Sequence, residues 1–406
     1  MQRDEYIIKL GDKNPKKRLK YAKKLGKLLK KDKSPADWTR GCCGFIHSEY
    51  SFSPYTPATA AYMAYNNRLK CAGLVDTGTL AGREEFLTAA GYFGLDVLSG
   101  VGYSTLLPVP FRDLCNVQSR DYSRFIYLAG FGFPSVGIKK IDGFLAEYRK
   151  ERQECNRKTL VQINGQFKEL GNLSYETDVL PVTKAEEGGS VTRTHVMLAL
   201  ARRLMRLVGT QNALVDYLTK VQNFSLSTRE TDILLSPVGR NYEFDLCAIL
   251  SRKLKVDDEQ YTSKVHKFVG AVLAAGGFVI YPVNEKEVIA GGEKYMDDMI
   301  RLLKQMNVSG VAYKASALGD ALALFEKKCR EAELLVLDGT DIRYARDLFY
   351  TGDMTAAQEL CFYAMRGNTY LAEQDLMDSF YGPRTEKRFP DIGKRLEVFA
   401  EVGRKL

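Results

Sequence analysis

The chain has 406 residues, of which 45% are hydrophobic and 27% are charged, a composition typical of a soluble globular protein. The longest nearly uncharged apolar stretch, residues 268–283, contains two adjacent glycines and a proline, so it is too broken for a membrane span. The eight cysteines include no CxxC spacing, and the N-terminus is charged throughout. We therefore expect reduced thiols, no signal peptide, no membrane partner and a cytoplasmic protein.

The net charge of +9 comes from one N-terminal segment. Residues 13–33 hold eleven lysines and arginines and one acidic residue, a net of +10, which leaves −1 for the rest of the chain. Asn14-Pro15 favours a helix start, and leucines follow at helical spacing, so residues 1–36 are predicted to form a basic amphipathic helix. Its lysine face is either simply solvated or a binding surface for nucleic acid or another anionic partner.

Short apolar strands alternate with helices between residues 37 and 140. We expect strands at 41–46, 71–76 and 95–103, with helices at 59–68 and 81–90. Apolar strands separated by helices are typical of a parallel sheet that is covered on both faces. This segment is therefore predicted to be the first part of an α/β barrel.

A largely helical insertion is expected at residues 141–265. It begins with a long charged helix at 141–169 and a loop-rich stretch at 171–190. Further helices are predicted from 192 onward and at 213–222, 228–235, 242–253 and 257–275. The strand–helix pattern then resumes in residues 266–406, with strands at 277–281, 310–313 and 334–337 and helices at 296–305, 317–332 and 355–365. The fold class is therefore α/β, with the remainder of the barrel after the insertion.

Polar side chains follow several of the predicted strands. His47 follows the first strand, Asp76 ends the second, and Ser104 ends the third. Asp338 and Asp341 follow the strand at 334–337. In parallel α/β barrels the functional side chains lie at the C-terminal ends of the strands, so we expect these residues to gather on one face.

These segments resemble the PHP family, named for polymerase and histidinol phosphatase. The resemblance covers most of the chain and includes the stretches YSFSPY, LPVTKAEEGGSVT and NYEFDL. It implies a distorted TIM-like (βα)7 barrel. It also implies a metal-dependent hydrolase, a phosphoesterase that holds up to three divalent metals.

The family's metal-ligand motifs are incomplete in this chain. His-x-His reads Phe45-Ile46-His47, and Asp-His reads Asp76-Thr77. A glutamate usually follows Val-Gly-aromatic, where this chain has Ser104, and the closing Asp-x-His corresponds to Asp341-Ile342-Arg343. The resemblance thus implies a degenerate site in which His47, Asp76 and Asp341 are the remaining metal ligands.

An arginine in a ligand position repels a divalent metal and suits phosphate or carboxylate. We therefore expect an eroded metal site that is not a trinuclear phosphoesterase and that binds a small anionic ligand. The residues expected around that ligand are Thr77, Ser104, His195, Arg343 and Arg346.

Two alternatives stay open, and with them whether the protein is an enzyme. One is a reduced phosphoesterase that holds a single Mn or Zn ion on His47, Asp76 and Asp341, with no cofactor otherwise. In that reading Arg343 or Arg346 holds the phosphate. The other is binding of nucleic acid or another partner through the basic N-terminal helix. His195 and Asp76 also have simpler roles open to them, His195 as a helix cap and Asp76 as a loop anchor.

Overall fold

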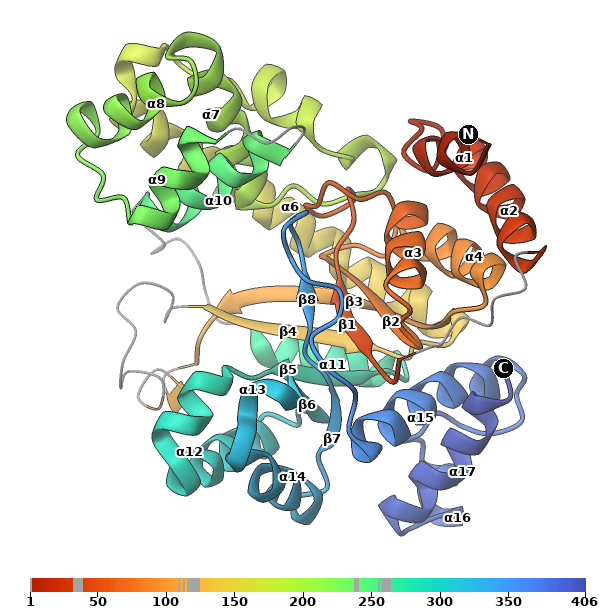
Figure 1. The fold of residues 1–406 in the computed structure, drawn as a ribbon. Coiled ribbons are helices and arrows are strands. Elements are labelled where there is room, and N and C mark those ends of the chain that lie inside the picture. The colour runs from red at the N-terminus through yellow and green to blue at the C-terminus, as the bar shows by residue number, and fades with distance from the viewer. Residues whose placement is uncertain are drawn as a thin grey trace.

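A computed structural model describes residues 2–31, 39–108, 110–111, 114, 125–236, 241–254, 256 and 264–406. Its centre is one curled sheet of eight strands with helices around it (Figure 1), compatible with a TIM-like barrel. The strands are β1 (Cys42–Ile46), β2 (Cys71–Thr77), β3 (Asp96–Leu106), β4 (Phe125–Phe131), β5 (Phe278–Pro282), β6 (Gly310–Tyr313), β7 (Leu335–Asp338) and β8 (Asp341–Ile342). Their order in the sheet is β7-β6-β5-β4-β3-β2-β1-β8.

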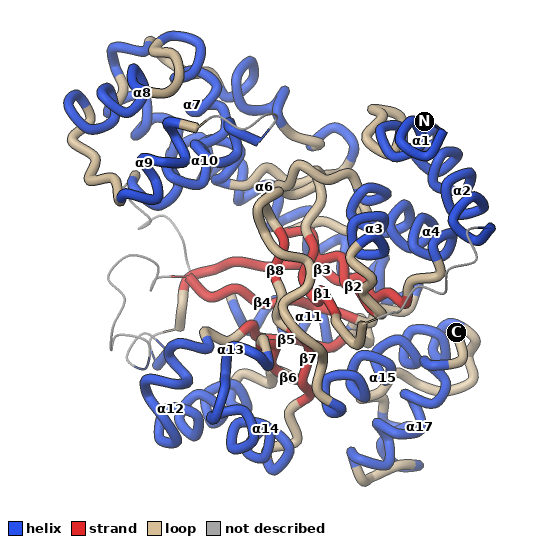
Figure 2. Tube along the Cα trace, viewed as in Figure 1, coloured by secondary structure: helices blue, strands red, loops and turns tan. Residues whose placement is uncertain are grey.

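The sheet is parallel except around β4. β1, β2 and β3 pair in parallel, as do β5, β6 and β7, whereas β4 is antiparallel to both β3 and β5. The expectation of an all-parallel sheet is therefore wrong at this point, and β4 was not predicted. β3 also runs three residues past the predicted end, and its far half pairs with β4 to form a long ribbon (Figure 2).

The two ends of the strand order lie against each other. Only Gly339 and Thr340 separate β7 from β8, yet β7 pairs with β6 while β8 pairs with β1. The Phe45 N–H donates to the Thr340 carbonyl at 3.0 Å. A Cβ on Gly44 would lie 2.1 Å from the Asp338 carbonyl oxygen, so this close approach of β1 to β7 requires glycine.

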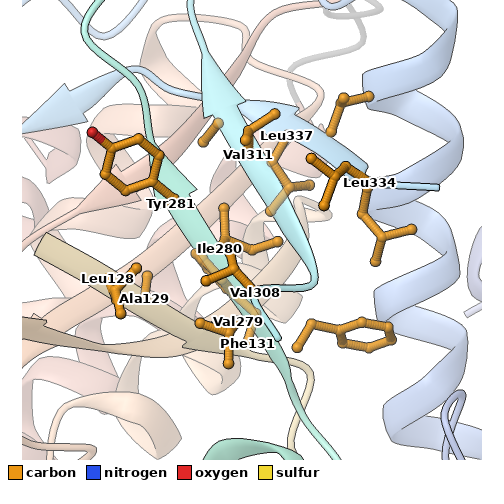
Figure 3. Close-up of a cluster of buried hydrophobic side chains, with 14 of the residues drawn as sticks. Leu128, Ala129, Phe131, Val279, Ile280, Tyr281, Val308, Val311, Leu334 and Leu337 are labelled. Carbon is orange, nitrogen blue, oxygen red and sulfur yellow. The ribbon is translucent and has the colours of Figure 1, made fainter. Parts of the chain in front are cut away.

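Aromatic side chains fill the inside of the curl. Phe45 packs edge-on against Phe131 with ring centroids 5.5 Å apart. Both rings are fully buried. Apolar side chains of β4 to β7, including Ala129, Ile280 and Val311, continue this core (Figure 3). Phe45 is therefore part of the apolar filling at the position where the resemblance expects a histidine ligand.

Helices cover the outside of the sheet and match most of the predicted ones. They are α3 (Pro57–Asn66), α4 (Arg83–Phe93), α11 (Val265–Ala274), α12 (Glu285–Gln305), α13 (Ala315–Leu318), α14 (Leu322–Glu331) and α15 (Ala356–Glu373). α16 (Pro383–Arg388) and α17 (Ile392–Arg404) were not predicted. The first residues of the predicted helix at 257–275 lie outside the described residues.

A group of helices between β4 and β5 has its own apolar core. α6 (Ser135–Gln166), α7 (Arg193–Leu207), α8 (Asn212–Asp216), α9 (Thr228–Leu235) and α10 (Tyr242–Lys253) contribute to it. The bounds of α9 and α10 confirm the predicted ones. The loop-rich stretch at 171–190 contains three short helical turns, among them Tyr175–Val179. Phe52 and Tyr344, which follow β1 and β8, also pack in this core and so join it to the strand ends.

The basic N-terminal segment is a helical hairpin of α1 (Gln2–Lys9) and α2 (Pro15–Lys31) that packs against α4. Its anchor is Arg18, which is fully buried and donates to both carboxylate oxygens of Glu85 at 2.8 and 2.6 Å. The same guanidinium donates to Glu49 at 2.9 Å and to the Asp12 carbonyl at 3.0 Å. The helix start predicted at Asn14-Pro15 is confirmed, but residues 2–9 form a separate helix instead of one helix over residues 1–36, of which residues 1 and 32–36 lie outside the described residues. The inner face of α2 is fixed to the body.

In the part of the chain that the structure describes, no helix is long and apolar enough to cross a membrane. The seven described cysteines are all free thiols.

Two helix glycines should respond oppositely to alanine. A Cβ on Gly26 of α2 would lie 2.4 Å from the Tyr92 carbonyl oxygen, so Gly26→Ala should lower the free energy of unfolding by about 1–3 kcal/mol through overpacking. A Cβ added to Gly143 of α6 would have nothing within 4 Å. Gly143→Ala should therefore raise the free energy of unfolding by about 0.5–1 kcal/mol, because alanine has the higher helix propensity. Urea denaturation of both variants measures the difference, and effects of the same sign would contradict the close contact of α2 with α4.

Candidate functional site

The C-terminal ends of β1 and β8 bring three of the predicted site residues together. His47 directly follows β1, and its backbone N–H donates to the Ile342 carbonyl at 2.9 Å. Asp341 lies in β8 with its Cα paired to that of Phe45, and Arg343 follows two residues later. The pairing of β8 with β1 therefore places these residues next to one another, as the strand-end rule predicted.

His47, Asp341 and Arg343 form one charged group. Arg343 Nε lies 3.0 and 3.2 Å from the two carboxylate oxygens of Asp341, and His47 Nε2 lies 3.3 Å from Oδ1. Burial alone would raise the pKa of Asp341, but the Arg343 cation and then the His47 ring hold that pKa below its usual range. Asp341 is thus an ionised carboxylate paired with Arg343 and is not free to bind a metal.

Tyr127 of β4 completes this group. The Arg343 guanidinium lies 5.2 Å from the centre of the Tyr127 ring, and the His47 ring lies 6.4 Å from it. A Cβ on Gly102 would lie 1.9 Å from the Tyr127 hydroxyl oxygen, so the phenol occupies space that a glycine leaves open. Burial raises the pKa of this hydroxyl, so it keeps its proton at neutral pH. Tyr127 was missed because the strand that carries it was not predicted.

Several polar groups of this cluster make no hydrogen bond with the described residues. The Tyr127 hydroxyl is buried without one, and so is His47 Nε2, whose nearest charged atom is Asp341 Oδ1 at 3.3 Å. The Arg343 side chain, 38% exposed, hydrogen-bonds through Nε, and its two terminal amino groups form no hydrogen bond within the described part of the chain. Buried polar groups are usually hydrogen-bonded, so this cluster has the character of a binding site for a molecule with acceptor atoms.

Asp76 is placed as an anchor of the loop after β1. It is 1% exposed and accepts from the Ser48 N–H at 2.7 Å, the Ser48 hydroxyl at 2.6 Å and the Ser51 hydroxyl at 2.8 Å. Burial raises its pKa, although the hydrogen bonds from Ser48 act in the opposite direction. Both carboxylate oxygens are thus engaged by the loop, and the serines of the SEYS stretch at residues 48–51 were the signal that could have shown it.

Thr77 is the last residue of β2, whereas Ser104 lies inside β3 and pairs with Tyr127, so the prediction that it ends the strand is wrong. The Thr77 carbonyl accepts a hydrogen bond from the Ser190 hydroxyl, which ties β2 to the segment before α7. The backbone N–H and carbonyl of Ser104 both lie 3.3 Å from the Tyr148 hydroxyl of α6. In both cases these contacts hold the helical segment against the strands.

His195 and Arg346 are engaged elsewhere. His195 Nδ1 accepts from the Thr192 N–H at 3.0 Å in a capping box at the start of α7, and burial lowers its pKa to about 3. Arg346 pairs with Asp245 of α10 at 2.9 Å. Neither side chain contacts His47, Asp341 or Arg343 through any hydrogen bond, ion pair or ring contact between described residues. The imidazole is neutral at physiological pH, so it offers no cation to an anionic ligand.

Asp338 at the end of β7 is buried at the seam with β1. Its Oδ1 accepts from the Thr340 N–H at 2.9 Å and from the Gly44 N–H at 3.4 Å. Burial raises the pKa of Asp338 from 3.8 to about 6 in spite of these hydrogen bonds.

Asp338→Asn should change stability in a pH-dependent way. Because the pKa of Asp338 is raised in the folded protein, protonated Asp338 makes its full contribution to stability at pH values below its pKa in the unfolded chain. That contribution is lost as the pH rises through about 6. At neutral pH the ionised carboxylate therefore costs about 2–3 kcal/mol, whereas asparagine keeps an oxygen acceptor without the charge. We expect the variant to gain about 1–3 kcal/mol at neutral pH and to lose that advantage near the unfolded pKa. Urea denaturation at the two pH values tests this, and a pH-independent difference would contradict it.

The predicted metal ligands do not fit a multi-metal centre. No group of three or more His, Cys, Asp and Glu side chains that could hold a metal ion occurs within the described ranges. Asp76 is hydrogen-bonded by serines, and Asp341 is paired with a fixed cation that would repel a divalent ion. Of the three, only His47 has an uncommitted donor atom.

Comparisons with known proteins show the fold. No protein-family model and no curated protein matches the chain. Among solved structures, an amidohydrolase from Chromobacterium violaceum, with bound sulfate and no metal, matches with a TM-score of 0.50 and 18% identity over 78% of this chain and 93% of that one. A protein from Bifidobacterium adolescentis, described as a candidate metal-dependent phosphoesterase, matches with a TM-score of 0.48 and 18% identity over 77% and 93%. The first of these matches shows that the chain shares the α/β fold of that protein.

Proposed function

We propose that this is a PHP-like barrel protein with an eroded metal site, which binds a small phosphorylated or carboxylate ligand at Arg343. In this proposal residues 37–140 and 266–406 form a distorted (βα)7 barrel, and residues 141–265 are a helical insertion. The observation that carries it is the cluster of His47, Tyr127 and Arg343 beside Asp341. In this cluster the Tyr127 hydroxyl, His47 Nε2 and the terminal amino groups of Arg343 make no hydrogen bond with the described residues.

An anion matches the chemistry of this group. The terminal amino groups of a guanidinium offer two parallel donors that fit the oxygens of phosphate or carboxylate. Asp341 holds Nε and so fixes the plane of Arg343, while the protonated Tyr127 hydroxyl supplies a further donor nearby. Binding through a positioned arginine needs no metal, and the Asp341 carboxylate keeps the cation in place when the ligand leaves.

A reduced phosphoesterase with a single Mn or Zn ion is the second candidate. The observation in its favour is that His47 Nε2 is buried without a hydrogen bond and lies 3.3 Å from Asp341 Oδ1. Against it stand the Arg343–Asp341 ion pair and the serine contacts of Asp76. Metal binding there would require Asp341 to exchange its arginine for the ion.

Metal analysis of the purified protein distinguishes the two. We expect well under one equivalent of bound transition metal per chain, and no change in the His47→Ala variant. Two or three tightly held metals per chain would contradict the proposal. One equivalent of Mn or Zn that is lost in His47→Ala, but kept in a variant of the exposed His266 on α11, would favour the phosphoesterase instead.

A further inference from the structure

We propose that the exposed face of α2 binds the phosphate backbone of a nucleic-acid duplex, independently of the site at Arg343. Seven lysines of this helix are exposed, namely Lys16, Lys17, Lys20, Lys23, Lys24, Lys27 and Lys30. With 3.6 residues per turn they fall within an arc of about 140°. We call this surface the lysine face.

The lysine face has a fixed orientation. On the opposite side of α2, Arg18, Ala22, Leu25 and Gly26 are buried against the body. The Arg18–Glu85 ion pair and the close approach of Gly26 to Tyr92 prevent the helix from rotating. α2 lies on the outside of the molecule beside α4 (Figure 1). Its exposed lysines therefore face the solvent.

The charge of this face is not neutralised locally. α2 contains no acidic residue, and none of the seven lysines forms an ion pair with a described residue. Since the chain outside residues 13–33 has a net charge of −1, the excess positive charge of the protein belongs to this segment. A row of cations about 21 Å long suits a polyanion with regularly spaced charges, which is the character of a duplex backbone.

The surroundings favour a duplex over a single strand or a membrane. Lys24 covers the nearby rings of Tyr6 and Tyr21 at 5.5 and 5.1 Å, so these aromatics are not free to stack on bases. Ile8 of α1 is the one large apolar side chain exposed among residues 2–30, too little for insertion into a bilayer. Contacts through lysine alone predict binding without sequence preference.

Fluorescence anisotropy with a labelled mixed-sequence duplex of roughly 20 base pairs tests the proposal, since that length exceeds the helix. We expect the logarithm of the association constant to fall linearly with the logarithm of the salt concentration. The slope should be about −4 to −6, because five or six phosphates are neutralised. DNA and RNA duplexes should bind similarly. Lys16→Glu/Lys20→Glu/Lys23→Glu/Lys27→Glu should weaken binding at least about tenfold and flatten the slope.

The matched control carries the same charge change on α6, at the exposed Lys139, Lys140, Lys150 and Lys158. It should keep most of the affinity. A second α2 variant replaces the same four lysines by glutamine, which has a similar helix propensity. It should also lose affinity for the duplex, so the loss cannot be attributed to a folding defect caused by the glutamates. Equal losses on α2 and α6, no duplex binding, or binding of phosphatidylserine vesicles in preference to the duplex would each overturn the proposal.

Discussion

Arg18→Met should lower the free energy of unfolding by about 3–5 kcal/mol, the largest stability effect expected in this chain. The guanidinium is fully buried and holds Glu85 through two hydrogen bonds, while Glu85 also accepts from the Ala58 N–H at 3.0 Å. Removing the cation leaves a buried carboxylate without its counter-charge, which costs more than the pair itself contributes. Urea denaturation followed by circular dichroism measures the loss.

Two further variants separate this charge effect from general damage to α2. Lys20→Met changes an exposed residue of the same helix and should stay within about 0.5 kcal/mol of the parent protein. Adding Glu85→Gln to Arg18→Met removes the stranded charge and should recover part of the loss. A loss below about 1 kcal/mol for Arg18→Met would show that the hairpin is not anchored by this residue.

Arg343→Gln should weaken binding of inorganic phosphate by roughly tenfold to a hundredfold, because charge-assisted hydrogen bonds contribute about 1.5–3 kcal/mol. The guanidinium is the cation of the proposed site. Its Nε is held by Asp341, which leaves its terminal amino groups as the donors proposed for the ligand. Glutamine retains a donor but neither the charge nor the forked geometry. Isothermal titration calorimetry gives the two affinities.

Arg346→Gln is the natural comparison, since it removes the same charge three residues away. Its partner is Asp245 of α10, so we expect phosphate affinity to change by less than about threefold and stability to fall instead. The phosphate affinity of Tyr127→Phe should lie between those of the two arginine variants, because this change removes one neutral hydrogen-bond donor. Equal losses in Arg343→Gln and Arg346→Gln would mean that general electrostatics, not a built site, attracts the anion.

Much of the fold could be predicted because the apolar runs are short and well bounded. β6, α9 and α10 have the predicted bounds, and β1, β2 and β7 differ by one residue. β4 was missed because its pattern, FIYLAGF, is apolar at almost every position and so shows no period of its own. Its antiparallel direction depends on pairing with β3 and β5, which no local pattern reveals.

The part of the candidate site that lies at strand ends could be predicted from the sequence. His47 and Asp341 were expected from the rule that functional groups gather at the C-terminal ends of strands, and Arg343 from the family resemblance. Tyr127 could not follow, since it reaches the cluster from the antiparallel β4 across Gly102. The Arg18–Glu85 pair spans 67 positions, and the cap that holds His195 depends on its neighbour Thr192 rather than on any ligand. Such partnerships arise from tertiary packing and not from spacing along the chain.

The most direct test of an anion site in place of a metal centre is a phosphate titration of the chelator-treated protein, repeated with Mn²⁺ present. If Arg343 and Tyr127 form the site, phosphate binds saturably without metal, and Mn²⁺ leaves the affinity unchanged. If phosphate binds only after Mn²⁺ has been added, the metal centre is intact and the proposal of a metal-free anion site is contradicted.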